Sequence, residues 1–113
     1  MNRNKQRTVR VTGGVAILVA LGVLGGSARA QGAGAATYKT KCAACHGPDG
    51  KGDTSIGKTN KIRDLGSADV QKQSDAELTT IIADGKGKMP AYGKSLKADQ
   101  VKELVAFIRS LKS

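Results

Sequence analysis

The chain has 113 residues, with two cysteines, one histidine, three aromatic residues and a formal net charge of +10. Two cysteines and one histidine leave a tetrahedral zinc site without a fourth ligand of that kind. The sequence holds no internal repeat, no low-complexity segment and no second domain, so one small domain is expected.

The first thirty residues have the composition of a secretory signal peptide. Four basic residues open the chain: Arg3, Lys5, Arg7 and Arg10. An apolar run follows at residues 15–24, and Ala28 and Ala30 supply small side chains at the two positions that a signal peptidase reads. The sequence predicts a signal peptide at residues 1–30, cleaved after Ala30, and export of residues 31–113. A retained membrane anchor is the alternative, but the apolar run is shorter than the roughly 20 residues that span a bilayer.

The predicted mature domain is small and basic. Residues 31–113 contain 14 lysines and arginines against 9 acidic residues, which gives a net charge of +5. A domain of this size buries about two thirds of its unfolded surface and usually needs a disulfide, a metal or a cofactor. The domain has only three aromatic residues, Tyr38, Tyr92 and Phe107. Because these fill little of a core, a large flat cofactor is expected to complete it. Nucleic acid is not expected as a partner of an exported chain with so few aromatic side chains.

The first helix of the mature chain is predicted from apolar residues that recur every three or four positions. The residues of this stripe are Ala35, Tyr38, Cys42 and Cys45. Glycines and a proline at residues 47–52 end the helix in a tight loop. This loop is not a phosphate-binding loop, because Asp53 stands where that motif needs lysine.

Two cysteines three residues apart, followed directly by a histidine, form the segment Cys42-Ala-Ala-Cys45-His46. Positions i and i+3 of a helix share a face, so Cys42 and Cys45 can each reach one vinyl group of the same porphyrin. His46 is then expected beneath the iron as an axial ligand. This spacing is the attachment signature of c-type haem, and it predicts one covalently bound haem c with its iron.

Three alternative roles for this segment fit the sequence less well. A thioredoxin-like redox pair requires a βαβ pattern, and no strand runs surround the motif. A permanent disulfide between Cys42 and Cys45 would close too short a loop to stabilise the fold much. A zinc site would lack its fourth ligand.

The middle of the mature chain has a poor pattern until a second helix begins after Ser74. Between residues 53 and 73 we expect loops, with one short helical turn that starts at residues 67–69. Ser74 and Glu77 form a capping box, in which each side chain accepts a hydrogen bond from the other residue's amide. This helix is expected to end at Gly85 in the left-handed conformation.

The last helix, at about residues 98–111, has the strongest periodicity in the chain. Its apolar face is formed by Val101, Leu104, Val105, Ile108 and Leu111. The opposite face is polar, so this helix is expected to pack one side on the core.

Between the second and the last helix lies a glycine-rich loop, residues 85–93, that contains Met89. Met1 leaves with the predicted signal peptide, so Met89 is the single methionine of the mature chain. We predict that its thioether is the second axial ligand of the iron and that Pro90 stiffens the loop. The alternative is a methionine that fills a gap in the core, which these polar surroundings do not favour. A thioether raises the reduction potential, and two filled axial positions leave no open site for oxygen or a substrate.

The chain resembles the small monohaem class I cytochromes c of the bacterial periplasm. The matching segments are residues 42–52, 85–92 and 104–111. The resemblance implies an all-α class I cytochrome c fold, in which three main helices and loops surround one covalently attached haem. It also implies that the first and last helices cross through Gly34, Tyr38 and Phe107. The alternative places Gly34 in a mobile N-terminal tail.

The chain departs from the family pattern in three ways. No proline between residues 52 and 73 offers a carbonyl to the second ring nitrogen of His46, although histidine ligands nearly always have an acceptor there. No tryptophan is present to bind a haem propionate, so Arg63 or a nearby lysine is expected to do so. Lys97 replaces the usual serine or threonine before the last helix, which predicts a weaker cap.

These features predict an electron carrier and not an enzyme. The first hypothesis is a periplasmic, monomeric shuttle that carries one electron at a time between a reductase and an oxidase or another terminal acceptor. One alternative is a five-coordinate haem protein, such as a peroxidase-like enzyme or a gas sensor. Another is a membrane-anchored haem subunit of a respiratory complex.

The partners implied are soluble or membrane-bound redox proteins that dock at the haem edge. Four lysines bracket the methionine loop: Lys86, Lys88, Lys94 and Lys97. We expect this positive collar to steer an acidic partner. The alternative is an ordinary solvated surface.

Overall fold

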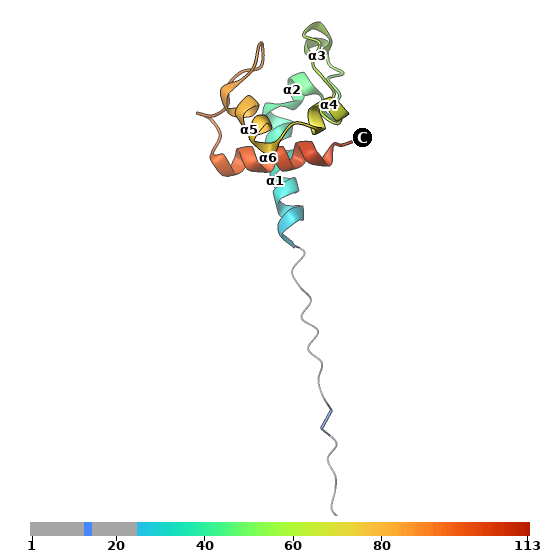
Figure 1. The fold of residues 1–113 in the computed structure, drawn as a ribbon, viewed down its shortest axis with the longest axis vertical. Helices are drawn as coiled ribbons and strands as arrows, with labels where there is room; N and C mark the ends of the chain where they lie inside the picture. The colour runs from blue at the N-terminus through green and yellow to red at the C-terminus, as the bar shows by residue number, and fades with distance from the viewer. Residues whose placement is uncertain (1–12, 15–24) are drawn as a thin grey trace, which may run out of the picture.

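The computed structural model describes residues 13–14 and 25–113 (Figure 1). Its helices are α1 (Gly25–Lys41), α2 (Ala43–His46), α3 (Ser55–Thr59), α4 (Ala68–Gln71), α5 (Asp75–Asp84) and α6 (Ala98–Ser110). Within these residues there is no strand, only an isolated bridge between Lys86 and Met89. The predicted all-α fold, with three longer helices, is confirmed.

The predicted signal peptide falls largely outside the described residues, because these omit residues 1–12 and 15–24. The expected cleavage point after Ala30 lies within α1, and cleavage there stays a prediction. None of the helices in the described ranges combines the length and the apolar character needed to cross a bilayer.

Helices α1 and α6 cross at close range, and the crossing depends on a glycine (Figure 1). A Cβ atom on Gly34 would overlap the carbonyl oxygen of Glu103 and lie 3.1 Å from the Cβ atom of Phe107. Beside this contact the rings of Tyr38 and Phe107 pack with their centroids 4.7 Å apart. The predicted crossing is confirmed, and the placement of Gly34 in a mobile tail is wrong.

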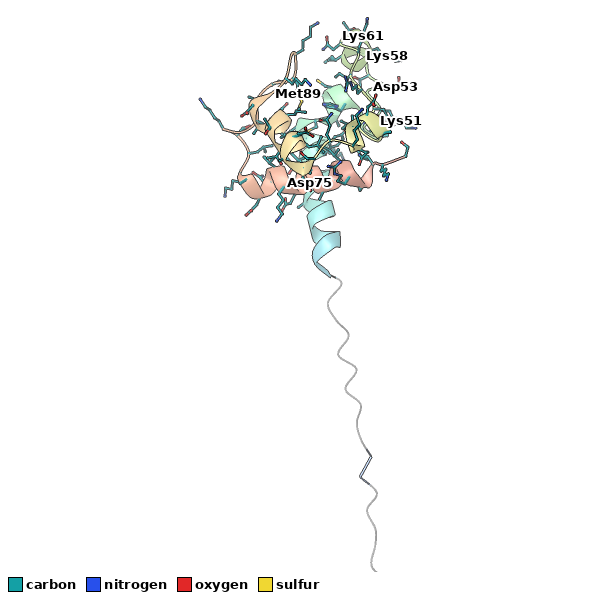
Figure 2. The ribbon with its side chains drawn as sticks, in the orientation of Figure 1. Lys51, Asp53, Lys58, Lys61, Asp75 and Met89 are labelled. Carbon is teal, nitrogen blue, oxygen red and sulfur yellow. The ribbon has the colours of Figure 1, made fainter. Side chains whose placement is uncertain are left out.

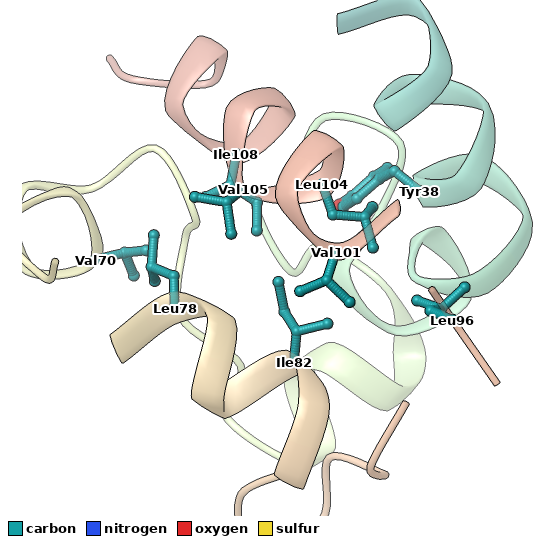
Figure 3. Packing of buried hydrophobic residues seen from close by; sticks show 9 residues of the cluster. All are labelled: Tyr38, Val70, Leu78, Ile82, Leu96, Val101, Leu104, Val105 and Ile108. Carbon is teal, nitrogen blue, oxygen red and sulfur yellow. The ribbon is translucent and has the colours of Figure 1, made fainter. Parts of the chain in front are cut away.

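The hydrophobic core joins α1, α4, α5 and α6 (Figure 3). Its buried members are Tyr38, Val70, Leu78, Ile82, Leu96, Val101, Leu104, Val105 and Ile108. Leu104 of α6, only 1% exposed, lies beside Tyr38 of α1. Each such side chain contributes roughly 1.5–3 kcal/mol to stability. The predicted apolar face of the last helix is therefore the face that packs.

The capping of α5 and α6 follows local sequence. Ser74 accepts from the amide of Glu77 at 3.0 Å, and Glu77 accepts from the amide of Ser74 at 2.7 Å, so the predicted capping box is confirmed. The cap expected to be weak at Lys97 gains a bond, because its amide donates to the side chain of Gln100 at 2.9 Å. Gly85 is not left-handed helical as predicted. Its φ is 76° but its ψ is 171°, because the chain must extend away from α5 into the next loop.

Residues 53–73 are more ordered than their sequence pattern predicts. The short turn expected near residues 67–69 is α4, but α3 was not predicted. The hydroxyl of Thr54 starts α3 by accepting from the amide of Gly57 at 2.8 Å. A Cβ atom on Gly57 would lie 2.9 Å from the carbonyl oxygen of Cys45, so only glycine lets α3 approach α2 this closely.

Arg109 of α6 fixes the segment between α4 and α5. Its guanidinium donates to the carbonyl of Gln71 at 2.8 Å and to the carboxylate of Asp75 at 2.8 Å. The side chain of Gln71 in turn donates to the carbonyls of Leu65 and Ile108, both at 2.8 Å. These bonds hold one wall of the cavity described next.

Candidate functional site

The four residues predicted to form the site meet around two cavities that share lining residues. Cys42, His46 and Met89 border a cavity of about 300 Å³. They also border a second one of about 160 Å³, which Cys45 completes. Figure 2 shows Met89 beside the loop that follows α5. Residues more than 40 positions apart in the chain therefore share one site.

The larger cavity has an apolar wall and a charged margin. The apolar lining residues are Leu65, Val70, Leu78, Ile81, Ile82, Leu104 and Ile108. Lys61, Arg63 and Lys86 also line it, and all three are exposed. An apolar macrocycle with acidic groups at its edge suits this lining, and Arg63, the residue predicted to bind a propionate, is among the basic residues present. Lys61, a lysine near Arg63 as the same prediction allowed, has a positive φ of 53°, which is unusual for a lysine.

The predicted continuous helix through Cys45 is broken at Cys42. Helix α1 ends at Lys41, and α2 begins after Cys42, whose carbonyl accepts from the amides of Cys45 and His46 at 3.2 and 3.0 Å. Both thiols are free and half-buried, so the alternative of a permanent disulfide is not what the structure shows. Burial, and then the neighbouring Cys45, raises the pKa of the Cys42 thiol.

Hydrogen bonds from outside the motif hold its backbone. The hydroxyl of Tyr38 donates to the carbonyl of Gly47 at 2.6 Å, and this bond is buried. The hydroxyl of Thr54 donates to the carbonyl of Cys45 at 2.7 Å. Thr54 was not predicted to support the site, although a threonine ahead of a short turn is an ordinary N-cap signal.

Two properties of the His46 imidazole bear on its role: which charge state its surroundings favour, and how its ring nitrogens are hydrogen-bonded. Burial lowers the pKa of His46, which favours the uncharged ring that metals bind. Its Nδ1 atom is buried and has no hydrogen-bond partner among the described residues. A buried polar nitrogen without a partner is costly unless another interaction offsets the loss. A metal bound at the other ring nitrogen would not supply this partner, so the acceptor that histidine ligands nearly always have is not found among the described residues, in line with the lack of a proline between residues 52 and 73.

The loop at residues 85–93 presents Met89 to both cavities. The amide of Met89 donates to the carbonyl of Lys86 at 2.9 Å, and the amide of Lys86 donates back at 3.2 Å. Gly85 has a positive φ, and a Cβ atom there would lie 2.6 Å from the carbonyl oxygen of Met89. Met89 packs against the core from its edge, so it also contacts the apolar cluster as the gap-filling alternative would require.

Comparisons with known proteins agree with this geometry. Residues 29–108 match the family described as cytochrome c oxidase, cbb3-type, subunit III. The cytochrome c6 of Aphanizomenon flos-aquae is 35% identical over 78 residues, which cover 66% of this chain and 83% of that relative. The chain belongs to the class I c-type cytochromes. The family predicted from the sequence is therefore confirmed.

Two further relatives differ in length: one is much longer than this cytochrome, and the other matches it over nearly its whole chain. The cbb3-type cytochrome c oxidase subunit FixPc of Rhizobium leguminosarum bv. viciae is 38% identical over 81 residues, which cover 70% of this chain but 27% of that longer protein. The solved structure of the KustC0563 c-type cytochrome superposes with a TM-score of 0.66 at 32% identity, covering 71% of this chain and 98% of that one. The class I fold is thus supported by an experimental relative of similar extent.

Membership of this family means that the cytochrome carries covalently bound haem c with its iron and transfers electrons. The apolar cavity, with Cys42, His46 and Met89 on its wall and the free thiol of Cys45 on the adjoining smaller cavity, fits that group.

Proposed function

We propose that this cytochrome is an exported one-electron carrier whose haem is attached through Cys42 and Cys45, with His46 and Met89 as axial iron ligands. The observation that supports the proposal most strongly is the meeting of Cys42, His46 and Met89 around one apolar cavity. The bound haem supplies reversible one-electron transfer, and nothing else in the proposal requires a chemical step.

The two proposed axial ligands, His46 and Met89, suit a site that transfers electrons and does not bind a substrate. Burial lowers the pKa of His46, which favours the uncharged ring that a metal binds. Met89 offers a soft, uncharged thioether, which favours the ferrous state and raises the reduction potential. With both positions filled by protein, no place remains for oxygen or a substrate. The protein is therefore a carrier and not an enzyme.

The compartment follows from the N-terminal segment. The basic start, the apolar run at residues 15–24 and the small residues Ala28 and Ala30 support a signal peptide that is cleaved after Ala30. The mature protein, residues 31–113, then works in the periplasm as a monomer. Mass spectrometry of the protein isolated from periplasm tests this directly, since a mass that retains residues 1–30 contradicts it.

Redox partners, soluble or membrane-bound, are proposed to dock where the cavities open. Lys86 lines both cavities and Lys88 lines the smaller one, whereas Lys94 and Lys97 line neither of these two. Of the four lysines of the predicted collar, the first two are thus better placed to attract an acidic partner such as a reductase or an oxidase.

Carbon monoxide binding tests the coordination that the proposal requires. The ferrous wild-type protein should not bind carbon monoxide at neutral pH, because Met89 occupies the sixth position. Met89→Ala should bind it and should have a lower reduction potential. Ready binding by the wild type would instead support a five-coordinate enzyme or gas sensor.

A second candidate function is a haem subunit of a respiratory complex. It is favoured by the match of residues 29–108 to the cbb3-type subunit III family and by the similarity to FixPc. Retention of residues 1–30 together with copurification in detergent with an oxidase would support this role over that of a free carrier.

A further inference from the structure

The turn that carries Met89 is held by hydrogen bonds between its own residues. The paired hydrogen bonds between Lys86 and Met89 fix these two residues relative to each other. Gly87, at the tip, has a φ of 57° and no atom within 4 Å of the position that a Cβ atom would take. The turn therefore needs other contacts to hold Met89 against the rest of the site.

Tyr92 supplies a contact between this loop and the helix that leads into the cysteines. Its hydroxyl donates to the carbonyl oxygen of Lys41 at 3.1 Å, although 51 positions separate the two residues. Lys41 is the last residue of α1 and directly precedes Cys42. Carbonyls in the last turn of a helix lack partners within the helix, so this oxygen is available to the phenol.

The same residue also ties the loop to α5. The amide of Tyr92 donates to the carbonyl of Ile82 at 3.0 Å, and the amide of Gly93 donates to that of Ala83 at 2.9 Å. These backbone bonds survive any change of the Tyr92 side chain. The hydroxyl alone accounts for the hydrogen bond from Tyr92 to α1, so it can be removed without undoing the attachment to α5.

The ring of Tyr92 lies against the same core cluster and the same cavity as Met89. It is half-buried, packs against the core together with Met89 and Cys42, and borders the smaller cavity with both of them. A shift of the Tyr92 ring away from α1 would therefore carry the Met89 end of the loop away from the cysteine-bearing side of the site.

We propose that Tyr92 is a positioning residue for Met89. By binding the carbonyl of Lys41, its hydroxyl holds the loop closed over the cavity and opposes replacement of the thioether by an external ligand. The inference rests on the proposed role of Met89 as an axial ligand. Tyr92 acts only through the loop.

Imidazole titration of the ferric full-length protein tests this role. Tyr92→Phe keeps the ring and removes only the hydroxyl. It should bind imidazole about fivefold more tightly than the wild type, because one neutral hydrogen bond no longer opposes opening of the loop. On heating, its weak long-wavelength ferric absorption should disappear at a lower temperature than in the wild type, while the helical circular dichroism signal persists. Loss of general stability would move both signals together.

Ser95→Ala is the matched control. It removes another exposed hydroxyl of this region, which donates to the carbonyl of Tyr92 at 3.2 Å and borders neither cavity. Its imidazole affinity should equal that of the wild type. Equal affinities in wild type and Tyr92→Phe, or an equal rise in Ser95→Ala, would overturn the proposal.

Met89→Ala separates this inference from the one on which it depends. If imidazole binds Met89→Ala no more tightly than the wild type, the proposed ligation by Met89 fails. If Met89→Ala binds more tightly but Tyr92→Phe does not, only the role of Tyr92 fails.

Discussion

Residues 42–47 and residues 85–93 border the same cavities but are held by different contacts. The first segment receives a buried hydrogen bond of 2.6 Å from Tyr38 to the carbonyl of Gly47. The second is joined to α1 by the hydroxyl of Tyr92 through an exposed bond of 3.1 Å. Exposed bonds open locally at lower cost than buried ones. The two sides of the site therefore differ in how readily they move.

This difference matches the chemistry proposed for each side. The firmly held segment carries the two thiols and the histidine, which must keep a fixed relation to each other. The exposed loop carries the thioether, the weaker ligand. Ligand exchange should therefore occur on the methionine side, and changes on the cysteine side should affect formation of the holoprotein instead.

The largest effect, loss of the folded holoprotein, is expected from changes to the segment at residues 42–47. Replacing Cys42 and Cys45 together by alanine should leave almost no folded holoprotein, because a domain this small lacks a sufficient core without its cofactor. Extraction with acidified organic solvent checks the wild type, in which the haem should stay with the polypeptide. Clean extraction of haem from the wild type would contradict covalent attachment.

The second largest effect, a loss of stability, is expected at the crossing of α1 and α6, because α1 leads into the cysteine motif. Gly34→Ala brings a methyl group onto the carbonyl of Glu103 and should lower the free energy of unfolding by about 3 kcal/mol. Gly32→Ala is the same change two residues earlier in α1, where nothing lies within 4 Å. Denaturant unfolding should show no loss of stability for it. Equal stabilities of the two variants would mean that α1 and α6 do not cross as closely as described.

A smaller effect, on the rate of electron transfer alone, is expected from the lysines in the loop at residues 85–93. Changing Lys86 and Lys88 to Glu should slow oxidation of the ferrous protein by anionic ferricyanide about tenfold at low ionic strength. The same change should speed oxidation by a cationic cobalt phenanthroline complex. Both differences should shrink as salt is added, because charges beyond about 8 Å are screened at physiological ionic strength.

Lys94 and Lys97, changed together to Glu, are the control with the same change in net charge. Since they border neither cavity of the described chain, their effect on both oxidants should be smaller. Rates that depend only on the net charge, equal for the two pairs, would show that the collar is an ordinary solvated surface.

The parts of the molecule that the sequence predicts well are those with a local signal. The capping box at Ser74 and the apolar face of α6 depend on residues three or four positions apart, and both are confirmed. The family was predicted from the cysteine motif, and comparison with known proteins confirms it.

The parts that escaped prediction depend on contacts between distant segments. Helix α3 forms because Thr54 caps it and Gly57 lets it approach α2, and neither feature has a periodic signal. The bond from Tyr92 to Lys41 links residues 51 positions apart, so no local pattern could indicate it. The positive φ of Gly85 was predicted, but its ψ was not, because ψ depends on the path of the methionine loop.

The weak long-wavelength absorption of the ferric protein reports on ligation of the haem by His46 and Met89. We expect the wild type to have this band at neutral pH and Met89→Ala to lack it while remaining folded and retaining covalent haem. Absence of the band from the wild type, or an unchanged ferric spectrum in Met89→Ala, would show that Met89 is not a ligand.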